Sequence, residues 1–148
     1  MKKLTRVAPK SIYRILDANI NRATEGMRVC EEILRFIAND RKLTNRFRNM
    51  RHQVFKLLGQ LAREKFISKR DSRKDICRGI SHDEIRRGNY QDIFFANMQR
   101  VKESIRVLEE FYKLLDLNTV IKLKKIRYRA YEIEKKAALK LSALSDIR

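Results

Sequence analysis

Two short clusters of polar residues stand where the helical pattern of the chain would place apolar ones. Asn19 and Arg22 form the first cluster, and Asn97 and Arg100 repeat it 78 residues later. At about 100° per residue, all four side chains fall within the apolar arcs of their helices. Because an unpaired guanidinium in a core is costly, we expect each Arg to face inward onto a negative charge.

The negative charge that these arginines need has two candidate sources. The chain itself could supply it, since Glu25 and Glu103 lie three residues after the arginines and Glu32 and Glu110 lie on the same side. The clusters would then be ion-pair networks that set the register of the helices. A ligand could supply it instead, and the planar, forked donors of Arg suit phosphate. The residues alone leave both interpretations open.

Two aspartates in a basic segment are candidate metal ligands. Asp71 and Asp75 lie four residues apart, after Arg70. Magnesium commonly binds through one or two carboxylates together with substrate phosphates. The alternative, which the spacing by itself favours, is a pair of loop acids neutralised by neighbouring Arg and Lys. Asp17, just before the first polar cluster, could join the site or be a surface acid.

Arg51 and Arg127 lie at the edges of two further apolar stripes. Each directly follows an expected core residue, Met50 or Ile126. We prefer to interpret them as snorkelling side chains, whose apolar stems cover the core while their charged ends reach solvent.

An internal repeat positions all of these residues. Residues 18–36 match residues 96–114 without gaps, with eight of 19 positions identical, and the segments that follow correspond at an offset of 76. Apolar periodicity predicts long helices over about 11–38, 44–64, 90–115 and 119–141. A short helix is expected from Ser81, where Ser81 and Glu84 have capping-box spacing. Short breaks make consecutive helices antiparallel neighbours.

The expected architecture is therefore an all-α, antiparallel helical bundle made of two repeated helix pairs. We expect a single domain over residues 1–148, with repeat one at about 11–64, a connection at 65–89 and repeat two at about 90–141. Only four Gly and one Pro interrupt the helix-forming sequence. The oligomeric state is not determined by these patterns.

The formal net charge of +18 indicates anionic partners. A basic helical module that binds nucleic acid is one function class consistent with that charge. The sequence contains no Walker A motif, dinucleotide fingerprint, protein-kinase motif set or His/Cys cluster typical of zinc. It has no apolar run long enough for a membrane span and no signal-peptide pattern, so we expect a cytoplasmic protein without membrane contact.

Several segments, in order, resemble one known family over about residues 12–136. The run LDANINRATEGMRVCEE at 16–32 is similar to the opening of the domain fused N-terminally to some bacterial thiamin-phosphate synthases. The similarity continues through Met50-Arg51-His52, Arg70-Asp71, Asp75, Ala96-Asn97, Arg100 and Arg127-Tyr128-Arg129. One departure follows Asp75, where the family pattern Asp-Val-Gly is replaced by Asp75-Ile76-Cys77.

That domain also occurs alone, as a monofunctional hydroxymethylpyrimidine phosphate kinase. The resemblance implies transfer of the ATP γ-phosphoryl group to hydroxymethylpyrimidine phosphate, with Mg²⁺, and thiamin-phosphate synthase as a possible functional partner. It gives matching positions, on which we base our own role hypotheses. The candidate catalytic residues are Arg22, Arg100 and Asp71. Asp71 and Asp75 are the candidate metal ligands. The candidate substrate- or ATP-binding residues are Asn19, Asn97, Glu25, Glu103, Arg51, Arg127 and Arg70.

Overall fold

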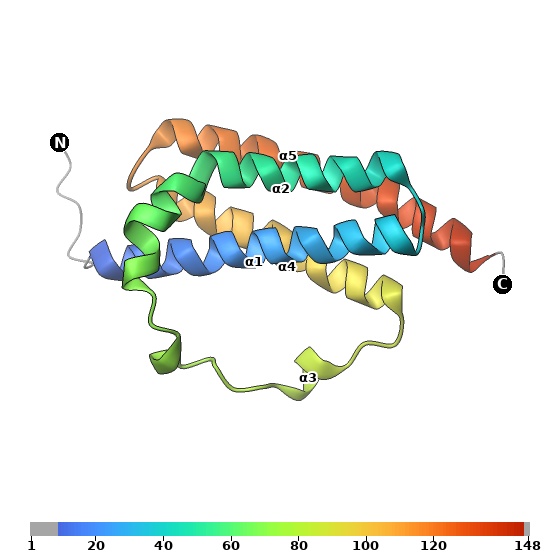
Figure 1. Cartoon of the computed structure of the whole chain (residues 1–148), viewed down its shortest axis with the longest axis horizontal. Helices are drawn as coiled ribbons and strands as arrows, with labels where there is room; N and C mark the ends of the chain where they lie inside the picture. The colour runs from blue at the N-terminus through green and yellow to red at the C-terminus, as the bar shows by residue number, and fades with distance from the viewer. Residues whose placement is uncertain (1–8, 147–148) are drawn as a thin grey trace.

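Four long helices pack as a bundle (Figure 1), in a computed structural model that describes residues 9–146 apart from the side chains of residues 83 and 84. Over this range the chain is all-α, with no strand. The long helices are α1 (Pro9–Phe36), α2 (Arg41–Leu61), α4 (Tyr90–Tyr112) and α5 (Leu117–Ser145). The predicted all-α bundle of two helix pairs is confirmed.

The second helix of each pair begins after an aspartate that caps its N-terminus. The Asp40 carboxylate accepts a hydrogen bond from the Leu43 backbone N–H at 2.9 Å, as an N-cap. The Asp116 carboxylate caps α5 in the same way, accepting from the backbone N–H groups of Asn118 and Thr119 at 3.1 Å. Because each aspartate is an N-cap, the helix begins at the residue that follows it. Helix α2 therefore begins three residues earlier than predicted, and α5 begins two residues earlier.

The bundle core lies between the two helix pairs. Helix α1 packs on α2 and on α4, and α5 packs on α4 and more sparsely on α2. The two long helices of each pair run antiparallel, as do the central helices α1 and α4 (Figure 1). Large side chains from all four helices are fully buried, among them Met27, Phe47, Phe94 and Leu123. Cys30 also belongs to the core, where burial raises the pKa of its thiol, as expected of a small apolar residue.

The two repeats meet where α1 and α4 come closest. A Cβ atom built on Gly26 would lie 2.8 Å from the Val101 Cγ2 atom and 3.0 Å from the Asn97 carbonyl oxygen. The counterpart of Gly26 in the second repeat is Ser104, which is also buried. Small residues at both positions therefore allow the two central helices to touch.

The connection between the repeats lies against α1. Helix α2 continues through a π-turn, Ala62–Phe66, and a 3₁₀ turn, Ile67–Lys69. There Phe66 is fully buried, with its ring centroid 5.2 Å from that of Tyr13. The chain then passes along the α1 side of the bundle, through a 3₁₀ turn, Ser72–Lys74, and α3, His82–Ile85 (Figure 1).

The short helix predicted from Ser81 is present as α3, which begins at His82. The predicted capping interaction of Glu84 lies outside the described side chains. Residues 72–82 and 85–89 are exposed, so the connection after residue 71 adds little to the core.

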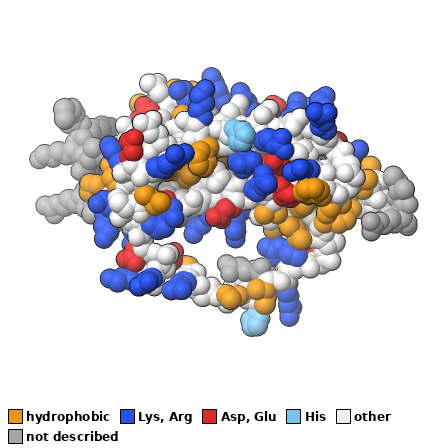
Figure 2. Space-filling view, viewed as in Figure 1, with side chains coloured by type: hydrophobic (Ala, Val, Ile, Leu, Met, Phe, Trp, Pro, Cys, Tyr) orange, Lys and Arg blue, Asp and Glu red, His pale blue; other side chains and the backbone are white. Residues whose placement is uncertain are grey.

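The surface of the bundle is strongly basic. Lys and Arg side chains are spread over the visible face of the bundle and gather on the connection (Figure 2). None of the helices within residues 9–146 is long and apolar enough to cross a membrane.

The helix crossing at Gly26 generates a stability prediction. We expect Gly26→Ala to lower the free energy of unfolding by about 1–3 kcal/mol, because the added methyl group overpacks the crossing and its backbone neighbour cannot yield. Gly79→Ala is the control, since a Cβ there meets nothing within 4 Å, and should change stability by less than about 0.5 kcal/mol. Urea unfolding followed by circular dichroism measures both; equal effects would contradict a close helix contact.

Candidate functional site

A groove of about 560 Å³ lies between the first half of α1 and the connection. Its charged lining residues come from both sides, so two segments about 50 residues apart in sequence form one surface. Helix α1 contributes Arg14, Asp17 and Arg22 to the lining, and the connection contributes Arg70, Asp71, Lys74 and Asp75. Apolar contact is offered by Ile15 and Ile76.

An ion pair anchors the connection to α1 at one end of this groove. The Arg70 guanidinium donates from Nε and Nη2 to the two carboxylate oxygens of Asp17, at 2.6 and 2.8 Å. Asp17 is only 5% exposed, so its charge depends on this partner. The hydrogen bond to Asp17 raises the pKa of Arg70, and the charge of Glu25 contributes. Asp17 is thus a buried structural acid at the edge of the site rather than a surface one.

The prediction that Arg22 and Arg100 face inward is wrong. Both side chains are exposed. Arg22 lies on the sector of α1 that includes Val29 and Phe36, and this sector is at the rim of the buried face, since Phe36 is 62% exposed. Arg22 nevertheless lines the groove, where a bound anion could meet it.

Asn19 faces the same groove from a buried position. Its Nδ2 donates to the Ile15 carbonyl oxygen of its own helix at 2.8 Å, and in the second repeat Asn97 donates to the Ile93 carbonyl oxygen in the same way. Each amide is thereby oriented by its own helix, and neither side chain hydrogen-bonds an Arg within the described residues.

The groove brings together only the first repeat's part of the predicted site. Asn19, Arg22, Arg70, Asp71 and Asp75 line it. The counterparts in the second repeat lie elsewhere, because only the first repeat is followed by the connection. Arg100 and Glu103 are exposed on α4, where the Glu103 carboxylate accepts from the Gln99 amide at 2.8 Å.

Arg51 and Arg127 are neither snorkelling nor in the groove, which corrects our interpretation of both. Arg51 donates from Nε and Nη2 to the Glu31 carboxylate at 3.1 and 3.0 Å. Arg127 pairs with Glu109 through the same two kinds of donor, and this hydrogen bonding raises the pKa of Arg127. Each pair ties the first helix of a repeat to the second.

The carboxylates of these pairs are the buried ionisable groups that the sequence pattern missed. Glu31 is fully buried and Glu109 is 2% exposed. Arg48 and Arg28 also approach Glu31, at 3.2 and 3.3 Å, so three guanidinium groups surround one carboxylate. The internal Arg–Glu network is therefore real, but it is centred on Glu31 and Glu109 and does not use Arg22 or Arg100. Of the expected glutamates, Glu32 and Glu110 join it through Arg28 and Arg106.

Asp71 and Asp75 remain candidates for a magnesium ion. The Asp75 carboxylate accepts from the Cys77 backbone N–H at 2.9 Å, and the Asp71 carbonyl oxygen accepts from Arg14 at 3.4 Å. No cluster of three or more possible ligands occurs among the described residues. Two carboxylates facing one groove fit a magnesium ion that takes its other ligands from water and substrate phosphate.

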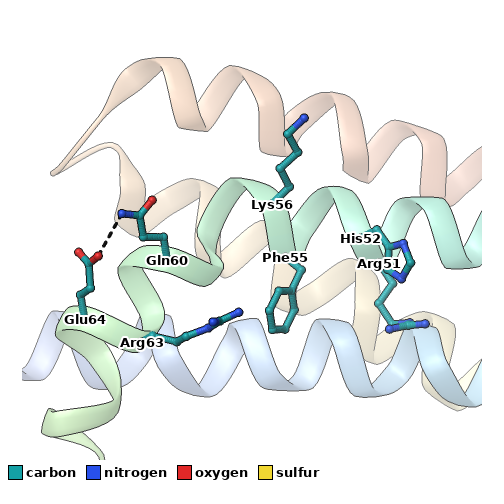
Figure 3. Close-up of a pocket in the computed structure, with 7 residues that line it drawn as sticks. All are labelled: Arg51, His52, Phe55, Lys56, Gln60, Arg63 and Glu64. Carbon is teal, nitrogen blue, oxygen red and sulfur yellow. Dashed lines mark hydrogen bonds between the residues drawn. The ribbon is translucent and has the colours of Figure 1, made fainter.

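A second groove, of about 730 Å³, follows the outer face of α2 (Figure 3). It contains Arg51 and His52 at one end and Arg63 at the other, with the half-exposed Phe55 between them. The Arg63 guanidinium carbon lies 5.7 Å from the centre of the Phe55 ring. This groove holds one predicted site residue, Arg51, whose charge is already compensated by Glu31, and it contains no carboxylate pair.

Two basic residues of the first groove were not among the predicted site residues. Arg14 lies eight residues before Arg22, or about two helical turns, and this spacing puts it on the same side of α1 as Arg22. That signal was present in the sequence. Lys74 carried no such signal, because a helical wheel cannot show where a side chain points when the residue lies in an irregular connection.

These features define an all-α domain built from a duplicated helix pair, with a mixed-charge groove where the connection meets the first repeat. A family model described as the ThiD2 family matches residues 14–136. The chain belongs to the ThiD2 family and is related to enzymes of thiamin biosynthesis.

The relatives found by sequence are named thiamine-phosphate synthases. One from Rhodopirellula baltica is 34% identical over 143 residues, covering 96% of this chain and 38% of the relative. Those from Synechocystis and Gloeobacter violaceus are 36% and 37% identical, each covering 88% of this chain and 37% and 38% of the relative. This chain thus spans less than two fifths of each of these relatives. No solved structure matches it.

The Arg70–Asp17 pair generates a second stability prediction. Arg70→Ala leaves a buried carboxylate without its cation, and we expect the free energy of unfolding at pH 7 to fall by about 2–4 kcal/mol. Adding Asp17→Asn should restore part of the loss, because a neutral amide is less costly to bury. Arg73→Ala, an exposed control, should change stability by less than about 0.5 kcal/mol. Urea titrations test this, and a neutral Arg70→Ala would contradict the anchoring role.

The Glu31 cluster generates a third prediction. Glu31→Gln keeps the shape but removes the charge that three arginines share, so we expect a loss of about 2 kcal/mol in the free energy of unfolding. Glu32→Gln is the matched control, because the Glu32 side chain is 36% exposed and its one ion pair among the described residues is with Arg28 of its own helix; its effect should stay below about 0.5 kcal/mol. Thermal and urea unfolding distinguish the two, and equal losses would mean that burial of Glu31 is irrelevant.

Proposed function

We propose that this chain is a hydroxymethylpyrimidine phosphate kinase that uses ATP and Mg²⁺ and acts in the groove between α1 and the connection. The observation that carries the proposal is the combination of three cations, Arg14, Arg22 and Lys74, with Asp71 and Asp75 in one groove of a ThiD2-family chain. The resemblance to thiamine-phosphate synthases supports a substrate from thiamin biosynthesis.

The acceptor in this reaction is a phosphate group, which sets what the protein must supply. An oxygen of the pyrimidine phosphate forms a bond to the γ-phosphorus of ATP, while the bond from that phosphorus to the β,γ-bridging oxygen breaks and ADP leaves. A phosphate monoester is largely dianionic at pH 7, since its second pKa is about 6. No general base is needed to create the nucleophile, and we therefore assign none.

The barrier to overcome is repulsion between two polyanions. Catalysis of phosphoryl transfer rests mainly on positioning and on neutralising charge. In our proposal the Arg22 and Arg14 guanidinium groups and the Lys74 ammonium group hold the two phosphate chains together. The buried Asn19 side chain orients the acceptor at the α1 wall, and Ile15 and Ile76 offer apolar contact to a pyrimidine ring.

Asp71 and Asp75 would hold the magnesium ion, which when bound neutralises charge on the ATP phosphates. Arg70 would act by positioning, because its pairing with Asp17 places these two carboxylates beside α1. Glu25 contributes through its charge near Arg70. Arg100, Asn97 and Glu103 of the second repeat lie outside this groove, and we give them no direct role in it.

The proposal predicts turnover that depends on Arg22. With hydroxymethylpyrimidine phosphate, ATP and Mg²⁺, we expect the diphosphate and ADP to form, and Arg22→Ala to lower kcat/KM by at least about 100-fold, because a cation on the transferring group is lost. Arg73→Ala removes an exposed Arg of the connection that does not line the groove and should retain turnover.

A coupled ADP assay, with mass-spectrometric detection of the diphosphate, measures these effects, and unchanged thermal unfolding confirms that the variants are folded. An inactive wild-type chain would contradict the kinase proposal. An active chain with undiminished turnover in Arg22→Ala would instead place the reaction outside this groove.

A further inference from the structure

The seam between α2 and α5, on the side of the bundle away from the connection (Figure 1), carries two grooves that are copies of each other. Each residue lining one groove has a counterpart, 76 positions away, lining the other. The first groove is lined by Arg46, Asn49, Met50, Gln53, Arg129, Glu132 and Ile133. The second is lined by Lys122, Lys125, Ile126, Arg129, Gln53, Lys56 and Leu57. The pseudo-twofold relation between the repeats thus extends to this surface.

The two grooves differ sharply in charge. The first, of about 240 Å³, holds two cations and the carboxylate of Glu132. The second, of about 340 Å³, holds four cations and no carboxylate. The difference arises at two positions of the repeat, because Asn49 is replaced by Lys125, and Glu132 is replaced by Lys56. Duplication by itself would give two grooves of the same charge. The two replacements therefore account for the strong positive charge of the second groove.

The cations of the second groove are largely uncompensated. Within residues 9–146, neither Lys56 nor Lys125 forms an ion pair with any carboxylate whose side chain is described. Lys122 acts on the carboxylate of Asp116 only through its charge, as one of the weaker causes that lower the pKa of that group. Four like charges beside one groove repel one another, and a bound anion would relieve this repulsion.

One of the four cations is held in place across the seam. The Arg129 Nη1 donates to the Gln53 side-chain oxygen at 2.6 Å, which joins α5 to α2 at the point shared by both grooves. Lys56 points from α2 toward α5 (Figure 3). The partly buried Leu57 and the buried Ile126 form the apolar part of the lining. Cationic hydrogen-bond donors of α2 and α5 therefore line the same groove.

We propose that this groove, lined by Lys56, Lys122, Lys125 and Arg129, binds a compact oligophosphate, separately from the proposed kinase groove. Lys122 and Arg129 are about 10 Å apart along α5, at 1.5 Å per residue, which matches a short phosphate chain. Nucleic acid would need a longer cationic track along its backbone, whereas the adjoining groove carries the carboxylate of Glu132. The proposal does not depend on the kinase function.

The test exchanges residues between the two copies. Using the full chain and inorganic tripolyphosphate at fixed ionic strength, isothermal titration calorimetry should find a site whose affinity falls at least about tenfold in the double variant Lys56→Glu with Lys125→Asn. This variant gives the groove the residues of its copy. All substituted positions are exposed, and thermal unfolding should be unchanged.

Two control variants separate a built site from general charge. Lys135→Asn with Lys140→Glu makes the same change in net charge on exposed positions of α5 outside the grooves, and should weaken binding by less than threefold. Asn49→Lys with Glu132→Lys should create a second site and raise the stoichiometry by one. Binding in Arg22→Ala should be retained, which distinguishes this groove from the kinase groove.

Three results would overturn the proposal. One is equal weakening by the groove variant and the charge-matched control. Another is unchanged stoichiometry in Asn49→Lys with Glu132→Lys. The last is a DNA duplex that binds more tightly than tripolyphosphate and loses its affinity in the groove variant, since the seam would then be a nucleic-acid surface.

Discussion

A buried carboxylate in each repeat is the interaction on which the rest of this bundle depends. Glu31 and Glu109 lie in the core with almost no solvent contact, so their charges must be met by arginines of the neighbouring helix. This requirement fixes how α1 sits on α2 and how α4 sits on α5. With those helix pairs set, the remaining apolar faces join at the close crossing by Gly26, and the flank of α1 that carries Arg22 stays open.

The scaffold is nearly symmetric, whereas its charged surfaces are not. Asp17 of the first repeat has Phe95 as its counterpart in the second, a side chain that is 46% exposed. Only the first repeat therefore has an acid that can anchor the connection, and only there does a mixed-charge groove form. The α2/α5 seam shows the same principle, since Lys125 stands where the first repeat has Asn49. In the α1 groove and at the α2/α5 seam, the two repeats thus share the same helix arrangement but carry different charged residues.

The reaction that we propose fits the groove between α1 and the connection, which offers cations, two carboxylates that could hold a metal ion, and apolar contact. A phosphate nucleophile is already ionised near neutral pH, so the chain needs cations and alignment more than acid–base chemistry. The large positive charge of the protein, +18, acts in the same direction because it draws anionic substrates toward every groove.

The sequence by itself determined the all-α class, the repeat and the polar clusters, because helical periodicity and internal similarity are local properties of the chain. It also placed Asn19, Arg22, Asp71 and Asp75 among the candidates, and they share one groove. The tertiary structure decided which of these residues meet and which carboxylates are buried. A helical wheel gives the direction of a side chain around its own axis, but not how far the neighbouring helices cover that direction. Glu31 lies just beyond the apolar arc and is fully enclosed by α2, while Arg22 lies within the arc and is left at its rim.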